Sequence, residues 1–364
     1  MASKSLHPIP FDSFTDPEAR LRRRSTDLLV HPDQMQNLRL RTAVIKALRA
    51  RLDAEGFLEV ETPILHTVHG GASAHPFRTY INAYGEDLTL RIAPELYLKR
   101  LVVGGSGPVY ELGRDFRNEG ADATHNPEFT VLEAYRPYAD YVQMRELTER
   151  LIKDAAQAVF GSVSLPLGRK ASSERVVRDV SGPWRVVSVC DALSEALGRR
   201  VDVQTDFEEL LALAQQYGVR VHEGMGPGAI VEELYGELVE AHTVEPTFYT
   251  DFPAETSPLA APHRSVPGLA ERWDLVINGM EMGCAYSELA DPLVQRERLT
   301  EQSLKAASGD LEAMEVDEDF LYALETGMPP TGGLGLGVDR LVMLLAQTQI
   351  RGVLSFPFVK PERS

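Results

Sequence analysis

The sequence has 364 residues, of which 43% are hydrophobic and 25% are charged. This composition is typical of a folded globular protein and excludes a disordered, collagen-like or coiled-coil chain. Acidic residues outnumber Lys and Arg by 54 to 37, and the net charge of −17 argues against a protein whose main partner is a polyanion.

No stretch approaches the roughly 20 uncharged apolar residues of a membrane-spanning helix, and residues 1–8 lack the apolar core of a signal peptide. We therefore expect a cytoplasmic protein that makes no membrane contact. The two cysteines, Cys190 and Cys284, lie far apart, with no Cys-x-x-Cys or Cys/His cluster around them. Neither a disulfide framework nor a structural zinc site is predicted.

Residues 1–32 contain four prolines and a basic run at residues 20–24, and they predict an extended N-terminal arm. One folded domain is predicted over residues 33–364. It begins with a helix over Asp33–Glu55, for which Asp33 is the expected N-cap and Gly56 the stop signal. A strand over residues 57–62 follows and ends at a proline.

The rest of the chain mixes strand and helix patterns. The predicted strands are Leu88–Ile92, Val109–Leu112, Glu128–Tyr135, Pro246–Phe252, Trp273–Met282 and Gly333–Val338. The predicted helices are Pro94–Val103, Tyr141–Val159, Val189–Leu197, Phe207–Tyr217, Ala229–Ala241, Pro292–Ala307, Asp317–Thr326 and Asp339–Leu345. Because strands and helices do not alternate strictly, we expect an α+β fold with an antiparallel sheet flanked by helices. Residues 163–188 carry little pattern, and a helical insertion is predicted over residues 163–241.

The glycine-rich run from Gly332 to Gly337 does not fit the dinucleotide-binding fingerprint, and no G-x-x-x-x-G-K-[ST] motif is present. Glycines weaken a strand, so several in one strand indicate the close approach of a ligand or of another backbone. Arg340 follows at the junction of strand and helix, where a guanidinium suits a phosphate. An ordinary ion pair beside tight helix–sheet packing is the structural alternative.

A second cluster of charged residues spans residues 113–135. An anionic ligand such as a phosphoryl group needs a planar bidentate donor, which Arg117 can supply. In the returning strand Phe129, Glu133 and Tyr135 share one face, an arrangement that suits a cationic ligand beside a flat ring. A half-buried strand with satisfied polar groups is the alternative.

Asp274 and Glu281 are the third candidate, as a pair of carboxylates for Mg²⁺. They are seven residues apart, so one regular strand places them on opposite faces. A shared ion requires a bulge or a turn at Asn278-Gly279. Without it, solvated acids at the ends of a sheet are the simpler interpretation.

Together these blocks resemble the class II aminoacyl-tRNA synthetases, and specifically the catalytic domain of lysyl-tRNA synthetases, from Asp16 onward. Residues 56–63 resemble motif 1 of that class, residues 116–129 motif 2 and residues 333–340 motif 3. The segments RIAPELYLKR at residues 91–100 and AYSEL at residues 285–289 resemble the lysine branch. The chain is particularly similar to the synthetase half of actinobacterial proteins that fuse a lysyl-tRNA synthetase to a membrane lysyl-phosphatidylglycerol synthase.

The resemblance implies a site for ATP and Mg²⁺. It implies that Arg117 holds the α-phosphate and the substrate carboxylate, that Arg340 holds the γ-phosphate, and that both act as catalytic residues. Adenine is expected between Phe129 and Arg340, with Glu119 at its amino group. The other residues implied at this end are His125 for ATP, and Asp274 and Glu281 for Mg²⁺.

The resemblance also implies a pocket for L-lysine. Glu95 is expected at the α-ammonium group and Glu288 at the ε-ammonium group. A charged amine that leaves water must be paired and hydrogen-bonded, which explains a pocket rich in acids and phenols. The lysine-binding residues implied are Gly71, Glu95, Glu133, Tyr135, Tyr286 and Glu288.

The chain departs from lysyl-tRNA synthetases at its start, since those enzymes carry an N-terminal OB-fold that reads the anticodon. We therefore expect tRNA recognition to be weak or restricted to the acceptor end. Paralogues of similar length lysylate a lysine of elongation factor P, but Ala93 and Gly283 are as in lysyl-tRNA synthetases and favour α-lysine over β-lysine. Cys284-Ala285 stands where bacterial lysyl enzymes usually have Asn-Gly, which bears on amino-acid selectivity.

We therefore expect an adenylate-forming ligase, similar to lysine-tRNA ligases, that makes lysyl-adenylate and passes the lysyl group to an acceptor. The expected acceptor is tRNA, and a protein amine or a small-molecule amine of a biosynthetic pathway are the alternatives. A lysine sensor without catalysis is an alternative of another class. The resemblance also implies a homodimer that forms through the Asp33–Glu55 helix and the strand after it.

Overall fold

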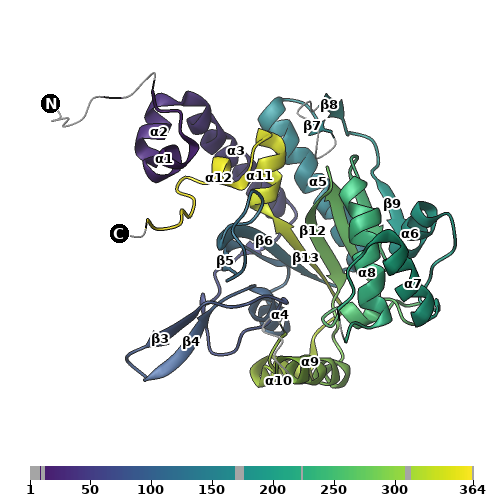
Figure 1. Ribbon diagram of the computed structural model, residues 1–364. Coiled ribbons are helices and arrows are strands. Elements are labelled where there is room, and N and C mark those ends of the chain that lie inside the picture. Colours follow the sequence, from purple (N-terminus) through teal and green to yellow (C-terminus); the bar gives the residue numbers. More distant parts are fainter. Residues whose placement is uncertain (1–8, 10–12, 169–175, 223, 308–312, 363–364) are drawn as a thin grey trace.

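The computed structural model of the chain describes residues 9, 13–168, 176–222, 224–307 and 313–362. An eight-stranded sheet forms the centre of this part of the molecule (Figure 1). In spatial order its strands are β1 (Leu58–Glu59), β5 (Val109–Phe116), β6 (Glu128–Pro137), β13 (Thr331–Gly337), β12 (Met280–Ser287), β11 (Arg272–Ile277), β10 (Thr247–Thr250) and β9 (Arg185–Ser188). Neighbours are antiparallel except at the edges, where β1 pairs with β5 and β9 pairs with β10 in parallel. The predicted α+β fold is confirmed.

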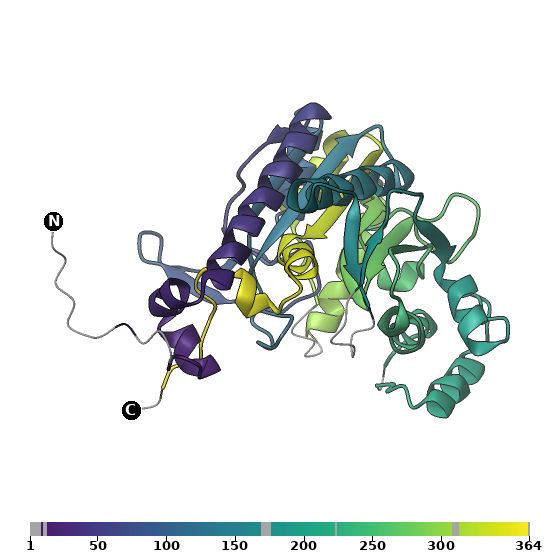
Figure 2. The ribbon, with the colours of Figure 1, turned by 90° about the horizontal axis from the view of Figure 1, so that it is seen from above.

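One face of the sheet is covered by α3 (Pro32–Ala54), α5 (Tyr141–Phe160) and α11 (Val338–Ala346). Figure 2 shows the purple α3 and the teal α5 side by side across the sheet. Leu132 of β6 and Leu334 of β13 point into this core and are fully buried. Side chains alternate along a strand, so the odd-numbered residues of β6 point to the opposite face of the sheet. The odd-numbered glycines of β13 belong to that face as well.

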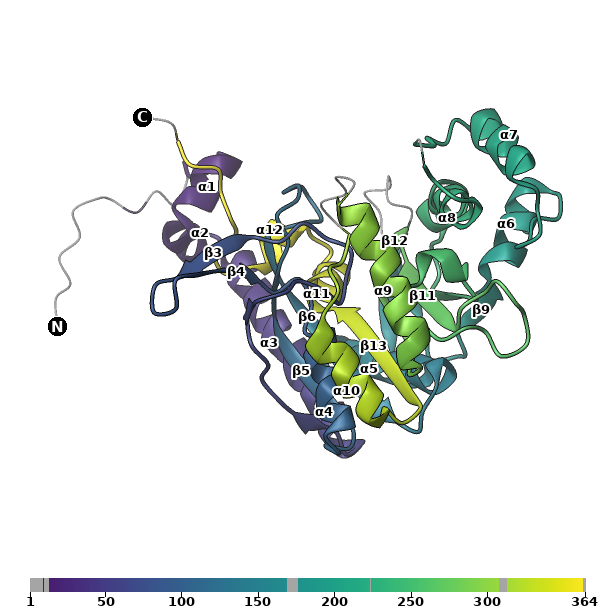
Figure 3. The same ribbon diagram turned by 90° about the horizontal axis from the view of Figure 1, so that it is seen from below.

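The opposite face is covered only at its two ends. Helix α4 (Glu95–Val103) packs beside β5 and β6, and the cluster α6 (Val189–Leu197), α7 (Phe207–Tyr217) and α8 (Pro227–Leu238) packs against β10 and β11. Helices α9 (Pro292–Ala307) and α10 (Glu318–Gly327) lie near α4, as Figure 3 shows. Parts of β6, β13 and β12 therefore remain uncovered between these groups of helices.

Smaller elements surround the central sheet. The strands β3 and β4 form a hairpin that projects from the body of the molecule (Figure 1). Among the described residues no helix is both long and apolar enough to cross a bilayer. The remaining elements are β2 (Leu65–His66), β3 (Arg78–Ile81), β4 (Glu86–Leu90), β7 (Ser164–Leu167), β8 (Val176–Asp179), α12 (Ile350–Val353), η1 (Glu240–His242) and η2 (Ala254–Thr256).

The prediction of an extended arm over residues 1–32 is wrong for residues 17–30, which form α1 (Pro17–Arg22) and α2 (Arg24–Val30). Asp16 caps α1 by accepting a hydrogen bond from the amide of Ala19. Arg24, expected in a solvated basic run, is buried, forms an ion pair with Asp27 and donates to a backbone carbonyl near the C-terminus. Residues 1–8 and 10–12 of the arm lie outside the described residues.

Other boundaries also differ from the sequence-based expectation. Helix α3 begins at Pro32 after His31, so Asp33 is not its N-cap. The strand predicted over Trp273–Met282 is the hairpin of β11 and β12, because Asn278 and Gly279 adopt positive φ angles of 55° and 66° and turn the chain. The predicted helical insertion over residues 163–241 also contains strands, and its β9 joins the central sheet; residues 169–175 lie outside the described part.

Candidate active site

A cavity of about 460 Å³ opens on the uncovered face of the sheet. Its size falls in the range of pockets that bind small molecules, which is roughly 300 to 1,000 Å³. Asp274 and Glu288 lie outside its lining. The predicted site residues that line it are Gly71, Glu95, Arg117, Glu119, His125, Phe129, Glu133, Tyr135, Glu281, Tyr286 and Arg340.

One end of the cavity is a buried cluster of acids and phenols. Glu133 and Tyr135 point to the same side of β6, and the Tyr135 hydroxyl donates to Oε2 of Glu133 at 3.0 Å. Burial raises the pKa of Glu133 well above its usual value, and the nearby carboxylate of Glu95 raises it further. A carboxyl group in this state gains from a cation placed beside it, which suits an ammonium ligand.

Glu288 lies behind this end of the cavity and is paired inside the protein. Nζ of Lys99 lies 2.5 Å from Oε2 of Glu288 and 2.5 Å from Oε1 of Glu95. The side chains of Lys99 and Glu288 are both fully buried. A Cβ atom on Gly333 would collide with Oε1 of Glu288, so glycine at this position of β13 makes room for the carboxylate. This explains one glycine of the glycine-rich run.

The other end of the cavity carries guanidinium groups. Arg117 lies beyond the end of β5, its Cζ lies 5.1 Å from the centroid of the Phe129 ring, and its buried Nε has no hydrogen-bond partner among the described groups. An unpartnered buried donor is costly, so Arg117 fits an anionic ligand here. In this arrangement Phe129 packs against Arg117 and still lines the cavity.

Arg340 and His125 lie close together at this end of the cavity. Nη1 of Arg340 donates to the carbonyl of Glu281 at 2.7 Å, and Nη2 lies 3.5 Å from Nε2 of His125. Nδ1 of His125 lies 3.0 Å from Oδ2 of Asp122, so Asp122 orients the ring. Glu119 is exposed in the loop between β5 and β6. These residues stay accessible to a ligand and to solvent.

The turn that a shared metal ion requires is present. Val276 pairs with Glu281 across the hairpin, and Asp274 lies two residues from Val276, so Asp274 and Glu281 share a face. Burial raises the pKa of Asp274 to about 7, and the neighbouring Glu281 raises it while Arg272 opposes the shift. Mg²⁺ commonly binds one or two carboxylates together with phosphate oxygens and water, and this pair fits that donor set. The described residues contain no group of three or more metal-binding side chains.

Three polar residues of the site were missed by sequence reasoning. Lys99 stands four residues after Glu95 on α4, a spacing that places both on one helix face and was a usable signal. Arg272 lines the cavity and holds Asp274 at 2.8 Å, from two positions earlier on β11. Asp122, three residues before His125, lies in a loop whose conformation the sequence did not predict.

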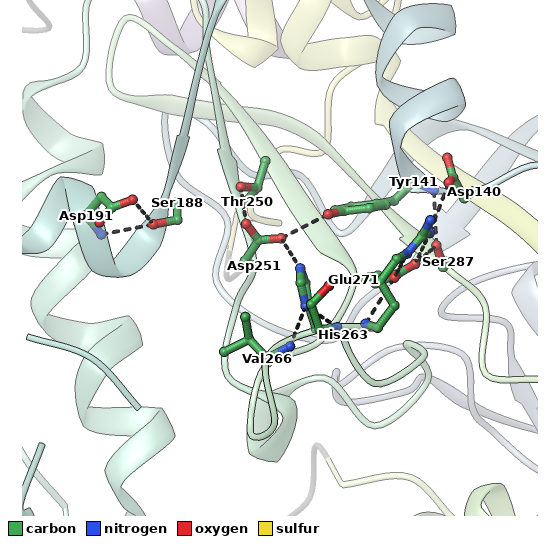
Figure 4. Close-up of polar contacts among 12 residues, drawn as sticks. Asp140, Tyr141, Ser188, Asp191, Thr250, Asp251, His263, Val266, Glu271 and Ser287 are labelled. Atoms are coloured by element: carbon green, nitrogen blue, oxygen red, sulfur yellow. Dashed lines mark hydrogen bonds and ion pairs between the residues drawn. The ribbon is translucent and has the colours of Figure 1, made fainter. Parts of the chain in front are cut away.

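A second group of polar side chains lies outside the cavity, near the start of α5 (Figure 4). Asp251 accepts a hydrogen bond from the Tyr141 hydroxyl at 3.1 Å, and Nε2 of His263 lies 3.7 Å from the same oxygen. Nδ1 of His263 accepts from the backbone amides of residues 265 and 266, while Ser188 bonds to Asp191 at the start of α6. The group holds the loop after β10 against α5.

The comparisons with known proteins agree with this geometry. Residues 16–360 match the family described as tRNA synthetases class II (D, K and N). Curated relatives named "Lysylphosphatidylglycerol biosynthesis bifunctional protein LysX" are 56% identical over 364 residues in Nocardia farcinica, 55% over 363 in Mycolicibacterium gilvum and 55% over 365 in Mycobacterium marinum.

Each alignment covers 99% of this chain but only 32% or 33% of the relative, so the chain spans about a third of the length of these proteins. The resemblance inferred from the motifs, and with it the prediction of an enzyme of the ligase class, is confirmed. The chain belongs to the class II tRNA synthetases of the D, K and N group.

Proposed function

We propose that the chain activates L-lysine with ATP as lysyl-adenylate and transfers the lysyl group to an acceptor, with tRNA as the first acceptor to test. One observation carries the proposal: a single cavity has buried carboxylates at one end and the unpartnered Nε of Arg117 at the other. A lysine placed along it directs its ammonium groups to the acids and its carboxylate to Arg117. An amino acid with a neutral side chain leaves a buried carboxylate unpaired, which is costly.

In the proposed reaction the lysine carboxylate attacks the α-phosphate of ATP in line. A bond forms between the carboxylate oxygen and the α-phosphorus, the bond to the bridging oxygen of pyrophosphate breaks, and pyrophosphate leaves. Arg117 neutralises charge on the α-phosphate, and Arg340 does so on the departing phosphates. Because the nucleophile is already ionised, positioning and charge neutralisation suffice, and the site needs no general base.

Asp274 and Glu281 are the residues that would hold Mg²⁺. When bound, the ion supplies charge neutralisation to phosphate oxygens. Arg272 keeps the Asp274 carboxylate in place through contacts of 2.8 and 3.1 Å.

In the transfer step a nucleophile attacks the carbonyl carbon of the adenylate, the bond from this carbon to the phosphate oxygen breaks, and AMP leaves. The proton of the nucleophile passes to the departing phosphate. With tRNA, this nucleophile is a hydroxyl group of the acceptor end. The printed names of the relatives refer to lysylphosphatidylglycerol biosynthesis, which supports a route in which the lysyl group finally reaches a lipid. A protein amine and a small-molecule amine remain the other acceptors to test.

The test begins with lysine-dependent exchange of pyrophosphate into ATP by the purified chain with Mg²⁺, and the Arg117→Ala variant as the negative control. Exchange is expected for wild type and not for the variant. Lysine binding without exchange would contradict the proposal and favour a lysine sensor.

The same preparation is then given labelled lysine with total tRNA, with phosphatidylglycerol vesicles, or with candidate protein acceptors. Acid-precipitable, base-labile label on tRNA supports the proposed acceptor. Label on the lipid without tRNA, or on a protein amine only, replaces tRNA with that acceptor.

We also propose a homodimer formed through α3 and the strand after it. Leu58 and Leu65, which follow α3, are 55% and 49% exposed, and apolar side chains of this kind gain from burial in an interface. Light scattering tests this part, and a monomer at assay concentration would contradict it.

A further inference from the structure

Lys99 is a buried cation at the lysine end of the cavity that no step above uses. Its side chain is fully buried, and the ring centroid of Phe320 of α10 lies 5.9 Å from Nζ. It does not line the cavity but lies behind the two acids that it contacts. A ligand in the cavity therefore meets Glu95, while Glu288 and Lys99 lie behind the lining.

The two contacts of Lys99 join elements that are distant in sequence. Glu95 and Lys99 are one helical turn apart on α4, whereas Glu288 follows β12 at the other side of the pocket floor. Lys99 donates a hydrogen bond to Oε1 of Glu95 at 2.5 Å and forms an ion pair with Oε2 of Glu288 at 2.5 Å. Neither oxygen of Glu288 has a hydrogen-bond partner among the described groups, so the contact with Lys99 is an ion pair and both oxygens can still accept.

The charges at this end can be counted. The acids in the described part of the lysine end are Glu95, Glu133 and Glu288, and Lys99 pairs with Glu95 and Glu288. Asp115, which lies near Glu133, has its own ion pair with Arg91 at 3.1 Å and is left out of the count. Three carboxylates and one ammonium leave an excess of two negative charges when all groups are ionised. One lysine molecule brings two ammonium groups, and its own carboxylate is matched by Arg117.

We propose that Lys99 is a positioning and specificity-determining residue, which orients Glu95 and Glu288 and sets the charge of the pocket to match the two ammonium groups of one lysine. This inference rests on the proposed function. Without Lys99 the carboxylate of Glu288 loses its only ion-pair partner in the described chain, so it holds a proton and no longer acts as an anion toward the substrate.

The test measures the KM of lysine and of ATP separately in pyrophosphate exchange with the full chain. Lys99→Met is expected to raise the KM of lysine about 10- to 100-fold, the value of a buried charge-assisted hydrogen bond, while the KM of ATP changes less than about threefold. Lys99→Arg keeps the charge and is expected to recover part of the loss. The matched control is Lys153→Met, because Lys153 pairs with Glu149 on α5, away from the cavity.

A pH series separates this role from a merely structural one. Removal of the cation lets the remaining acids hold a proton more strongly, so the defect of Lys99→Met is expected to shrink as the pH rises from about 6 to 8.5, where free lysine keeps its ε-ammonium group. A structural defect would not follow pH in this way. The ionisable groups near these acids are Tyr135 at all three, Tyr286 at Glu95, and Asp115 and Arg117 at Glu133.

A charge-balanced pair of substitutions serves as the control for a folding defect. If Lys99→Met is too unstable to assay, the double variant Lys99→Met/Glu288→Gln removes both buried charges and is compared with Glu288→Gln alone. If Lys99 acts through Glu288, its loss costs less in the Glu288→Gln background, so the effects on lysine KM are non-additive. Additive effects would overturn the inference.

Failure of this inference is distinguishable from failure of the proposed function. Wild-type exchange with an unchanged lysine KM in Lys99→Met, or with equal rises in the KM of lysine and ATP, overturns the role of Lys99 alone. Absence of exchange in wild type overturns the proposed function, and calorimetric titration with lysine then decides the role of Lys99. Equal affinity for lysine in wild type and Lys99→Met, or no binding of lysine by either, overturns the proposed role of Lys99.

Discussion

The two ends of the cavity are built in different ways. The acids of the lysine end come from a helix, a strand and the residue after another strand, and they are buried. Two of them, Glu95 and Glu288, pair with Lys99. The phosphate end uses a loop between β5 and β6 and the first turn of α11, where the side chains of His125 and Arg340 are 54% and 29% exposed.

This difference follows from what each end has to bind. Discrimination between amino acids needs fixed charges in a site from which water is excluded, because charge interactions are strong only there. Phosphates can be held by long cationic side chains near solvent, and pyrophosphate must leave after the reaction. Substitutions at the lysine end should therefore act on amino-acid selection and stability together, whereas those at the phosphate end should act on catalysis with little effect on stability.

The largest effect is expected from Arg117→Ala at the phosphate end. Its Nε has no hydrogen-bond partner in the described part of the chain, so the group can serve a ligand. Its loss should lower kcat/KM for pyrophosphate exchange by about 10³-fold. The matched control is Arg114→Ala, because Arg114 lies three residues earlier, is 43% exposed and pairs with Glu128. Equal activity of the two variants would remove Arg117 from the reaction.

Glu133→Gln at the lysine end should separate binding from stability. The pKa of Glu133 is raised on folding, so the folded protein binds this proton more strongly and loses stability as the pH rises above 4.5, the usual value for Glu. The neutral amide removes this loss, so the variant should unfold at a higher temperature than wild type at neutral pH. Its KM for lysine should rise about 100-fold. Thermal unfolding at several pH values and exchange kinetics measure both, and a drop in stability at neutral pH would contradict the assignment.

Two glycines of β13 allow the ends to be compared directly. A Cβ atom on Gly333 would collide with Glu288 and Tyr135, whereas one on Gly335 meets no heavy atom within 4 Å and enters the cavity. Gly333→Ala should lower stability and raise the KM of lysine about tenfold, since overpacking shifts its neighbours. Gly335→Ala should keep wild-type stability and raise the KM of ATP. Identical kinetic and thermal behaviour of the two variants would refute the division of the cavity.

The smallest effect is expected from Asp122→Asn. Asp122 accepts hydrogen bonds from the backbone amide of Thr124 and from His125, which lower the pKa of its carboxyl group, but it is 59% exposed. Exposed ion pairs contribute little, so the KM of ATP should rise only about two- to threefold and the thermal stability should stay unchanged. A change in the KM of lysine would place His125 closer to the amino acid than we propose.

Much of the fold was predictable from local sequence pattern. The helices Val189–Leu197, Phe207–Tyr217 and Pro292–Ala307 have the predicted bounds, because apolar periodicity and capping residues act within one segment. The N-terminal helices were missed, because their stability comes from distant contacts. Arg24 is buried by the C-terminal segment, which no local pattern can indicate.

The candidate site divides in the same way. Its motifs could be identified in the sequence. The sequence also predicted that Asp274 and Glu281 can share an ion only if the chain bends at Asn278-Gly279, and the structure has this turn. Glu288 was expected to contact the ε-ammonium group of the substrate directly. In the structure it lies outside the cavity lining and is paired with Lys99. Asp274 likewise lies outside the lining and is held by Arg272.

The sequence by itself determined the family, the order of the main strands and helices, and the residue types that face one side of β6. These properties depend on motif spacing and on the alternation of side chains along a strand. Only the tertiary structure decided which charges meet. Lys99 and Glu288 are 189 positions apart, as their numbering shows, and they become partners because the sheet brings the end of β12 against α4. A buried charge must find its partner in space, and no sequence spacing specifies that partner.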